Sequence, residues 1–341
     1  MARKVIISNR QDGEQSSSYN GESDMSVKQA HIVAEGYVKE VQRARKYNED
    51  ASYELGEIEK LVKNITDQEF PAGEPMAFHN FSVTLATIEL YKLACDVLDK
   101  GLAIFPMSVD LLADYLIYGI DCGRYSECEK RYETLCMIDK SEWTWRAFSF
   151  SIAYIKRLRE RTADAATRAE YKNTVETLAK EYKENLPYRE DGYRQYAELF
   201  SADPDRELSL LCEVLENEKI GACPASAFRY ADILFEQKKY YQALLAVKRS
   251  REDAKAQMQG GINEHYLSFL SALCKIAIAE GEGRKLNADE VNDIYSDFEI
   301  ALYGLTGDFR KTVRTRVQFL QKETKVQVGD EYENILELLG Y

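Results

Sequence analysis

The residues with the strongest capacity for chemistry in this chain are its seven cysteines and three histidines. Thiolates and imidazoles serve as nucleophiles, general bases and metal ligands when they are grouped at suitable spacings. The cysteines lie at positions 95, 122, 128, 136, 212, 223 and 274, and the histidines at 31, 79 and 265. No C-x-x-C or H-x-x-x-H spacing occurs among them. The spacing therefore predicts no bound metal and no cofactor.

The cysteines at 95, 128, 136 and 212 fall within helical patterns of apolar residues. In a reducing compartment such cysteines behave as small buried hydrophobic residues. We favour this interpretation, and a metal site or a redox switch stays open as the alternative.

Motifs of enzyme active sites are absent from the sequence. It contains no G-x-S-x-G, phosphate-binding glycine loop, H-E-x-x-H or EF-hand spacing. The segment Gly281-Glu-Gly283-Arg lacks the following glycine and the preceding strand that a dinucleotide-binding loop requires. Asp and Glu are too numerous for their spacing to identify a catalytic pair. We therefore expect a protein that is not an enzyme.

Two clusters of basic residues contrast with the acidic composition, one within 156–172 and one within 310–325. The first contains Lys156, Arg157, Arg159, Arg161, Arg168 and Lys172. The second contains the basic patch Arg310, Lys311, Arg314 and Arg316, followed by Lys322 and Lys325. Interleaved apolar residues give the second cluster the pattern of an amphipathic helix. Such a face is usually only solvated, and the alternative is contact with an acidic partner, with RNA or with another copy of the chain.

Helices must position all of these side chains, because apolar residues recur at helical spacing and no alternating strand pattern occurs. The clearest order is an internal repeat, since residues 75–106 and 109–140 can be laid over each other at an offset of 34 residues. At this offset Phe78, Phe81, Leu85, Tyr91, Ala94, Leu98 and Leu102 fall on Leu112, Tyr115, Gly119, Tyr125, Cys128, Tyr132 and Cys136. A period of this size is typical of helix–turn–helix units that bury their apolar faces by stacking.

The segment from Tyr91 to Pro106 resembles the second helix of a tetratricopeptide repeat, with aromatic, small and large residues in order and a proline past its end. The segments 123–136 and 240–250 resemble the same helix, and the second of them follows a fitting first helix. The resemblance is clearest over 75–140 and 224–252. It implies an all-α fold, an α-solenoid of antiparallel helix pairs that forms a right-handed superhelix. Tyr125 and Tyr240 are 115 residues apart, 13 more than three periods of 34, so longer or irregular helices are expected over 141–217.

In this family the first helix of each pair lines a concave groove. Carried onto this chain, the groove positions are Met76, His79, Val83, Ala86 and Thr87, then Asp110, Ala113, Ile117, Ile120 and Asp121 with Asp114 beside them, then Ala225, Phe228, Asp232, Phe235 and Glu236. The resemblance thus implies an apolar groove with several carboxylates, which suits a segment carrying Lys or Arg among hydrophobic residues. His79 and Val83 occupy two positions of the family's carboxylate clamp, so a chaperone-type clamp is not expected. The alternative is that neighbouring helices cover the apolar positions.

The chain is expected to consist of a flexible tail over 1–25 and a single solenoid over 26–341, with a helical C-terminal part over 262–341. Helices are expected at about 26–45, 49–66, 75–104 and 109–138 (two repeat pairs), 141–161, 166–185, 188–200, 204–217, 225–252 (a third pair), 262–280, 287–304, 308–323 and 331–339. Ser141 is expected to cap the helix that follows it, and the Asp203-Pro204 pair to start another.

The formal net charge of −13 disfavours a general nucleic-acid binder, because such proteins use Lys and Arg to neutralise phosphates. No run of eighteen apolar residues occurs, and the N-terminus has an apolar run of only three residues, so we expect a cytoplasmic protein. We therefore predict an adaptor or regulatory subunit that binds a basic or apolar segment of another protein. A peptide-sensing switch and an RNA-binding accessory protein stay open as alternatives, as does self-association.

Overall fold

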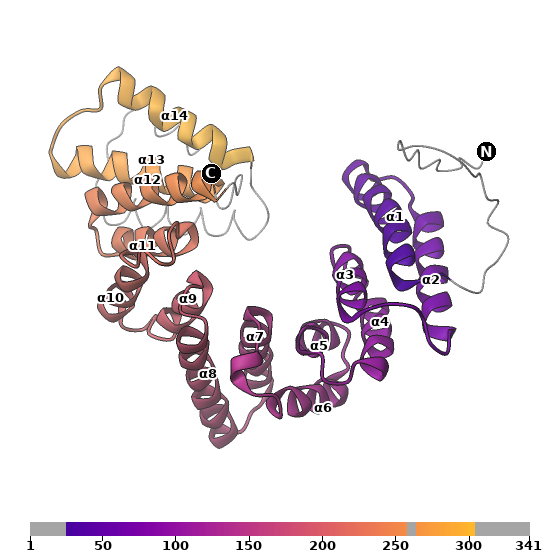
Figure 1. The fold of residues 1–341 in the computed structure, drawn as a ribbon. Helices are drawn as coiled ribbons and strands as arrows, with labels where there is room; N and C mark the ends of the chain where they lie inside the picture. Colours follow the sequence, from indigo (N-terminus) through magenta and orange to yellow (C-terminus); the bar gives the residue numbers. More distant parts are fainter. Residues whose placement is uncertain (1–24, 258–263, 304–341) are drawn as a thin grey trace. The chain divides into compact units, whose positions relative to one another are not determined.

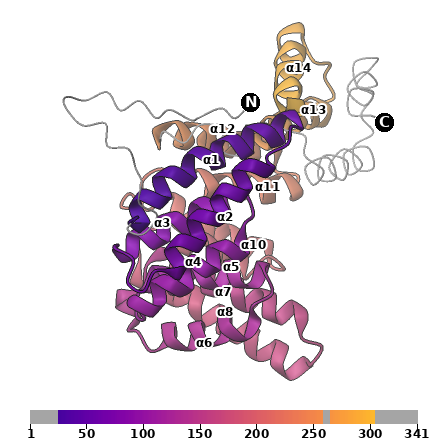
Figure 2. The same cartoon turned by 90° about the vertical axis from the view of Figure 1, so that its right-hand side faces the viewer.

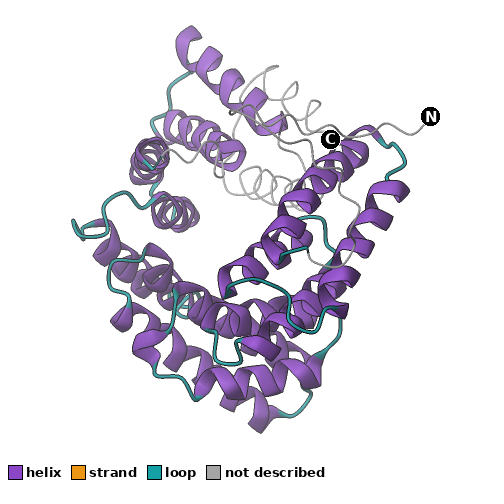
Figure 3. Cartoon of the chain, turned by 45° about the vertical axis from the view of Figure 1, so that its right-hand side comes forward, coloured by secondary structure: helices purple, strands orange, loops and turns teal. Residues whose placement is uncertain are grey.

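The computed structural model describes residues 25–257 and 264–303. Within these ranges the chain is all-α, with helices joined by short loops and no strand (Figure 3). The helices are α1 (Val27–Tyr47), α2 (Ser52–Asp67), α3 (Pro75–Ala86), α4 (Tyr91–Ile104), α5 (Val109–Asp121), α6 (Tyr125–Cys136), α7 (Trp145–Arg161), α8 (Ala165–Asn185), α9 (Glu190–Glu198), α10 (Pro204–Leu215), α11 (Pro224–Glu236), α12 (Tyr240–Ala256), α13 (Glu264–Gly281) and α14 (Ala288–Tyr303), with the 3₁₀ turn η1 (Lys140–Glu142) before α7. The expected fold class is confirmed.

The helices form two compact units, divided between Ile138 and Asp139. Unit 1 holds α1 to α6 and unit 2 holds α7 to α14 (Figure 1). Each unit is a stack of helix pairs in itself. A single solenoid running from 26 to 341, and its right-handed superhelix, stay predictions.

Unit 1 is built from the antiparallel pairs α1–α2, α3–α4 and α5–α6. The first helices of these pairs pack on one another in the order α1, α3, α5. On the other side α2 packs against α4, and the two lie side by side in both views (Figures 1 and 2). We call the row of first helices the first-helix layer.

Unit 2 repeats this arrangement with the pairs α7–α8, α9–α10, α11–α12 and α13–α14. Its first-helix layer consists of α7, α9, α11 and α13, each in contact with the next. The apolar core between the layers includes Phe235, Phe269 and Phe298. Burying one such side chain contributes about 1.5–3 kcal/mol to stability.

Five helix pairs share one turn geometry. The residue with a left-handed backbone is Asn48 (φ 55°), Glu89 (66°), Gly123 (84°), Lys238 (61°) or Gly283 (64°). The backbone N–H of the next residue donates to the carbonyl five residues back, at 2.7–3.1 Å, in the pairs Glu49–Ala44, Leu90–Leu85, Arg124–Gly119, Lys239–Leu234 and Arg284–Ala279. This Schellman arrangement satisfies a carbonyl at the end of the first helix and reverses the chain. Glu89 and Gly123 are 34 residues apart, so the turn repeats with the period of the sequence.

The described pairs that lack this turn are α7–α8 and α9–α10. The chain leaves α7 through Thr162 in an extended conformation, and α9 is only nine residues long. The irregular helices expected over 141–217 are thereby confirmed. Asp203 also caps α10 as predicted, since its side chain accepts a hydrogen bond from the Arg206 N–H.

The predicted start of a helix at Ser141 is wrong. The Asp139 carboxylate accepts hydrogen bonds from the N–H and hydroxyl of Ser141, which holds that residue inside η1. Trp143 then turns into the interior and packs against Phe148. The helix begins only at Trp145, with Thr144 as its N-cap.

Most of the repeat positions that define the 34-residue period are buried. Phe78, Phe81, Leu85, Ala94, Leu98, Leu112, Tyr115 and Cys128 are each 0% exposed. Cys95 is also buried as expected, but Cys136 is exposed and Cys212 is only half-buried. The expectation of burial is therefore wrong for Cys136. The reason is that α4 is packed between α2 and α5, whereas α6 packs mainly on α5.

Several predictions lie outside the described residues. They are the tail over 1–25 apart from its last residue, the helices at 308–323 and 331–339, and the basic patch Arg310, Lys311, Arg314 and Arg316 with the rest of the cluster over 310–325.

Candidate partner-binding site

Two of the groove positions in unit 1 form a buried pair between neighbouring first helices. The His79 Nδ1 atom of α3 lies 2.5 Å from the Asp114 Oδ2 atom of α5. His79 is 7% exposed and Asp114 is 0% exposed. Removing either partner would leave a buried polar group without its main contact. The structure therefore places these two residues in the interior, where they join α3 to α5.

The other groove positions of unit 1 are more accessible. Val83, Asp110 and Ile117 are half-buried, and Asp121 is exposed. Next to α3, the His31 ring of α1 contacts the Thr84 hydroxyl at 2.9 Å. The first-helix layer of unit 1 thus offers a surface that is partly apolar and partly acidic.

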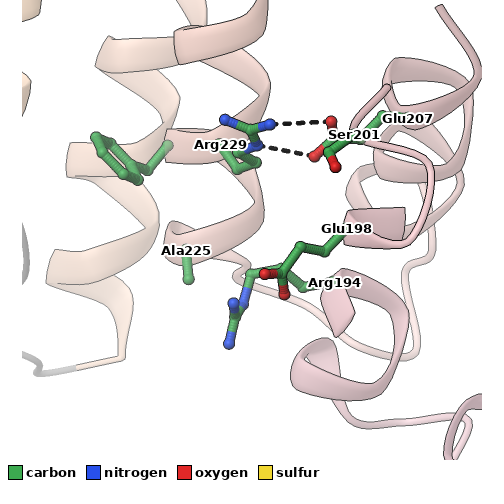
Figure 4. A pocket seen from close by; sticks show the side chains of 7 residues that line it. Arg194, Glu198, Ser201, Glu207, Ala225 and Arg229 are labelled. Atoms are coloured by element: carbon green, nitrogen blue, oxygen red, sulfur yellow. Dashed lines mark hydrogen bonds and ion pairs between the residues drawn. The ribbon is translucent and has the colours of Figure 1, made fainter. Parts of the chain in front are cut away.

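Two of the predicted groove positions of unit 2 line a pocket with a volume of about 590 Å³ between α9 and α11. Its lining comes from α9, the following loop, α10 and α11, and consists of Arg194, Glu198, Ser201, Glu207, Ala225, Phe228 and Arg229 (Figure 4). A volume of this size is within the usual range for ligand sites. The predicted position Phe228 and its neighbour in the groove pattern, Ala225, both face it.

An ionic network lies behind one wall of the pocket. The Arg229 guanidinium donates to both carboxylate oxygens of Glu207, at 2.8 and 3.0 Å, as the dashed lines in Figure 4 show. It also donates to Asp232 at 3.1 Å, and Asp232 accepts a further bond from the Tyr266 hydroxyl at 2.9 Å. The hydrogen bonds to Glu207 raise the pKa of Arg229, although partial burial opposes the rise. The network joins α10, α11 and α13 and orders this wall.

The remaining groove positions of α11 differ in accessibility. Phe235 is 0% exposed within the core, and Asp232 is 8% exposed. Glu236, which follows Phe235 in the sequence, is exposed. Of the predicted positions in this helix, Ala225 and Phe228 line the pocket.

The sequence interpretation missed Arg194 and Glu198, although the groove pattern reaches both. Counted from the first residue of α9, they occupy the same fifth and ninth positions that Phe228 and Asp232 occupy in α11. The resemblance is carried only onto the repeats at 75–140 and 224–252, so no groove positions are predicted in this helix, which is expected to begin at 188. The start of α9 is the signal that identifies them.

A second pocket of about 480 Å³ lies at the N-terminal ends of α9 and α11 and shares Ala225 with the first. Glu190 lines it and accepts a hydrogen bond from the Ser226 backbone N–H at 2.5 Å. Burial raises the pKa of the Glu190 carboxyl, and the hydrogen bond from Ser226 opposes this rise. Its carboxylate therefore joins the starts of the two helices.

Several members of the basic cluster over 156–172 are engaged within unit 2. The Lys156 Nζ atom lies 3.4 Å from Glu198 of α9, and Lys172 lies 3.7 Å from Glu176. Arg168 donates to the Thr162 carbonyl at 2.8 Å. Of these, Lys156 reaches a residue that lines the pocket.

The cysteines and histidines form no metal centre in the part of the chain that the structure describes, where no three His, Cys, Asp or Glu side chains gather around one point. Two thiols do approach each other, with the Cys122 Sγ atom 3.7 Å from that of Cys95. Burial raises the pKa of the Cys95 thiol. Among residues 25–257 and 264–303, no helix combines the length and apolar character needed to cross a bilayer.

No family model matches this chain, and no curated protein matches it. Among solved structures it is similar to a thermophilic TPR protein of Thermus thermophilus, with 13% identity, coverage of 53% of this chain and 92% of that one, and a TM-score of 0.42. It is also similar to PilF of Pseudomonas aeruginosa, with 14% identity, coverage of 77% and 96%, and a TM-score of 0.45. The C-terminal part of a TPR repeat-containing protein from Cytophaga hutchinsonii gives 14%, 76% and 95%, and 0.46. Because these TM-scores are low, we assign the helix-pair fold from the helix packing and the repeated turns of this chain itself.

Proposed function

We propose that the chain is an adaptor or regulatory subunit that binds a segment of another protein along its first-helix layers, without catalysing a reaction. The observation that carries this proposal is the pocket between α9 and α11. Two adjacent first helices contribute to it through groove positions, namely Arg194 and Glu198 of α9 and Ala225 and Phe228 of α11. A concave site with an apolar wall and a few polar groups is the usual form of a binding site.

Rigid helices make such a site suitable for recognition. A preformed surface loses little conformational entropy when a segment docks, so more of the contact free energy contributes to affinity. Unit 1 has a candidate surface of its own, formed by the accessible groove positions Val83, Asp110, Ile117 and Asp121. In unit 2, Asp232 and Glu236 adjoin the same face as Phe228. The buried His79, Asp114 and Phe235 would support this surface by holding its helices in place.

Blocking the pocket tests the proposal. Random dodecapeptides displayed on phage would be selected on the full chain and then measured against two variants. Ala225→Trp places a large side chain in the pocket, whereas Gln242→Trp makes a comparable change at an exposed position of α12. We expect the selected peptides to bind the wild type and Gln242→Trp and to lose most of their affinity for Ala225→Trp. Circular dichroism would confirm that both variants keep their helicity.

Two results would contradict the proposal. One is a selection that enriches no peptide at all. The other is a set of peptides that bind Ala225→Trp as tightly as the wild type, which would place binding elsewhere on the molecule.

A further inference from the structure

Most charged side chains around the pocket form a hydrogen bond or a close ion pair, and Arg194 forms neither within the described residues. Both oxygens of Glu207 receive hydrogen bonds from Arg229, and Glu207 is only 1% exposed. Asp232, behind Arg229, is bonded through both of its oxygens as well. These carboxylates have no strong need for a cation from a ligand.

Glu198, the other acidic residue of the lining, lies beside a cation of the neighbouring first helix. Its Oε2 atom is 3.4 Å from the Lys156 Nζ atom of α7. The two side chains are 50% and 35% exposed, so the pair is screened and weak, but it balances the charge of Glu198 locally.

Arg194 is the exception. Within the described residues its guanidinium makes no hydrogen bond or ion pair, and its Nε atom is buried without a partner. No dashed line reaches it in Figure 4. Glu190, four residues earlier, lies within reach of its charge but accepts its hydrogen bond from the Ser226 N–H instead. A guanidinium presents donors in a planar fork that matches a carboxylate, and a buried donor without an acceptor is unfavourable. Arg194 therefore keeps donors that no acceptor of the described residues uses.

The opposite side of the lining is apolar and held in place. Phe228 packs edge-to-face on Tyr266 of α13, with ring centroids 5.0 Å apart and an interplanar angle of 82°. Tyr266 is in turn fixed by its hydrogen bond to Asp232. A fixed aromatic ring can cover the apolar part of a ligand while its polar end reaches the guanidinium.

From this charge pattern we infer that the pocket binds an acidic side chain of a partner segment, with its carboxylate on Arg194 and an adjacent apolar residue against Phe228. The inference rests on the proposed function and specifies the chemistry of the partner. It differs from the expectation of a basic partner for this part of unit 2, because the carboxylates of the predicted acidic groove are here already bonded to Arg229 or paired with Lys156.

Fluorescence anisotropy with synthetic peptide pools tests the inference. Each pool is a fluorescein-labelled undecapeptide mixture of Gly, Ser and Ala with a fixed central pair, which is Glu-Leu, Gln-Leu or Lys-Leu. All three pools carry a C-terminal amide, and a fourth has the Gln-Leu pair and a free C-terminal carboxylate. We expect the Glu-Leu pool to bind the full chain at least tenfold more tightly than the Gln-Leu and Lys-Leu pools.

Variants of Arg194 test whether the preference for the Glu-Leu pool depends on its guanidinium. Arg194→Glu should abolish binding of the Glu-Leu pool, and Arg194→Lys should retain part of it, because the charge stays and the planar fork is lost. Arg159→Glu makes the same charge change at an exposed position of α7 and should reduce binding less than threefold. Lys156→Met should weaken binding by leaving Glu198 free to compete for Arg194, at i and i+4 on the same helix.

Several outcomes would overturn the inference. Equal binding of the three amidated pools, absence of binding by any pool, or a preference unchanged in Arg194→Glu would each do so. Preference for the pool with the free carboxylate would also overturn it, in favour of a chain terminus as the ligand. In each of these cases, loss of the phage-selected peptides in Ala225→Trp would still leave the proposed function standing, so the two failures are distinguishable.

Discussion

The pairs α3–α4 and α5–α6 of unit 1 and the pairs α9–α10 and α11–α12 of unit 2 use the same repeat positions in different ways. The fifth position of α3 is His79, which is buried and bonded to Asp114 of the next first helix. The fifth positions of α9 and α11 are Arg194 and Phe228, which line a pocket. Both unit 1 pairs have the left-handed turn of the repeat, whereas α9 is short and its pair lacks that turn.

In this molecule, therefore, two regular pairs are closed by a buried polar contact, whereas the shortest described α-helix adjoins a pocket. Between α3 and α5, whose pairs both have the turn, the first helices approach closely enough for His79 and Asp114 to bond to each other. Where α9 ends after nine residues, the face of α11 next to it is left partly open. Four predictions test this contrast, from the largest expected effect to the smallest.

The largest effect is expected at the buried pair of unit 1. Asp114→Ala leaves the His79 ring buried without its main partner, and the expected loss in the free energy of unfolding is about 3–5 kcal/mol. Arg194→Ala, at the pocket, should change stability by no more than about 0.5 kcal/mol, because Arg194 makes no bond to the described residues. Native-state hydrogen exchange of peptides from α3–α5 and α9–α11 measures both. Similar losses in the free energy of unfolding for Asp114→Ala and Arg194→Ala would contradict the contrast between the buried pair and the pocket.

Close helix approach in unit 1 should make Gly119 sensitive to a single methyl group. A Cβ atom there would lie 2.4 Å from the Cys128 Sγ atom, so Gly119→Ala is expected to cost about 1–3 kcal/mol. At Gly192 of α9 the nearest contact would be the Tyr182 ring at 3.1 Å. Since a helical Ala gains about 1 kcal/mol over Gly, Gly192→Ala should stay within about 1 kcal/mol of the wild type. Thermal unfolding compares the two, and a larger loss at Gly192 would contradict the prediction.

The shared turn predicts a gain in stability from the opposite change. Glu89 has a left-handed backbone (φ 66°), which is unfavourable for a residue with a side chain. Glu89→Gly should therefore stabilise unit 1 by about 1 kcal/mol. Thr162, which ends α7 in an extended conformation, provides the matched control, and Thr162→Gly should destabilise by about 0.5–1 kcal/mol. Urea unfolding would show whether the two changes have opposite signs.

The smallest effect is expected in the pH dependence of unit 2. Burial raises the pKa of Glu190 above its value in the unfolded chain. In the window between the two values the native state binds more protons, so the contribution of Glu190 to the free energy of unfolding falls as pH rises and is level above that window. Glu190→Gln keeps an acceptor for the Ser226 N–H and removes this fall. The difference in the free energy of unfolding, variant minus wild type, should increase with pH across the acidic range and then level off. A difference that does not change with pH would contradict the raised pKa of Glu190.

Much of the fold could be predicted from the sequence because its signals are local. The spacing of Phe78, Phe81 and Leu85 marks a helix face, and Asp203-Pro204 marks a helix start, and both interpretations are confirmed. At Ser141 the local signal was wrong, since a competing cap at Asp139 and the burial of Trp143 delay the helix.

The candidate site was predicted only in part. Phe228 was identified from the groove pattern, but Arg194 was missed because the repeat resemblance does not extend over 141–217 and the pattern was not carried onto the helix that contains it. The burial of His79 with Asp114 was also missed. Whether a groove position faces a neighbouring helix or solvent depends on the distance between the helices. The residue pattern of a single helix does not determine that distance.

By itself the sequence determined an all-α chain of paired helices, because apolar periodicity, proline stops and turn residues act within a few positions of the chain. Only the tertiary structure decided where those pairs close tightly and where a pocket remains, and which carboxylates are already neutralised by arginine. The physical reason is that burial and ion pairing arise between residues far apart in sequence, such as Glu207 and Arg229, and depend on the packing of whole helices.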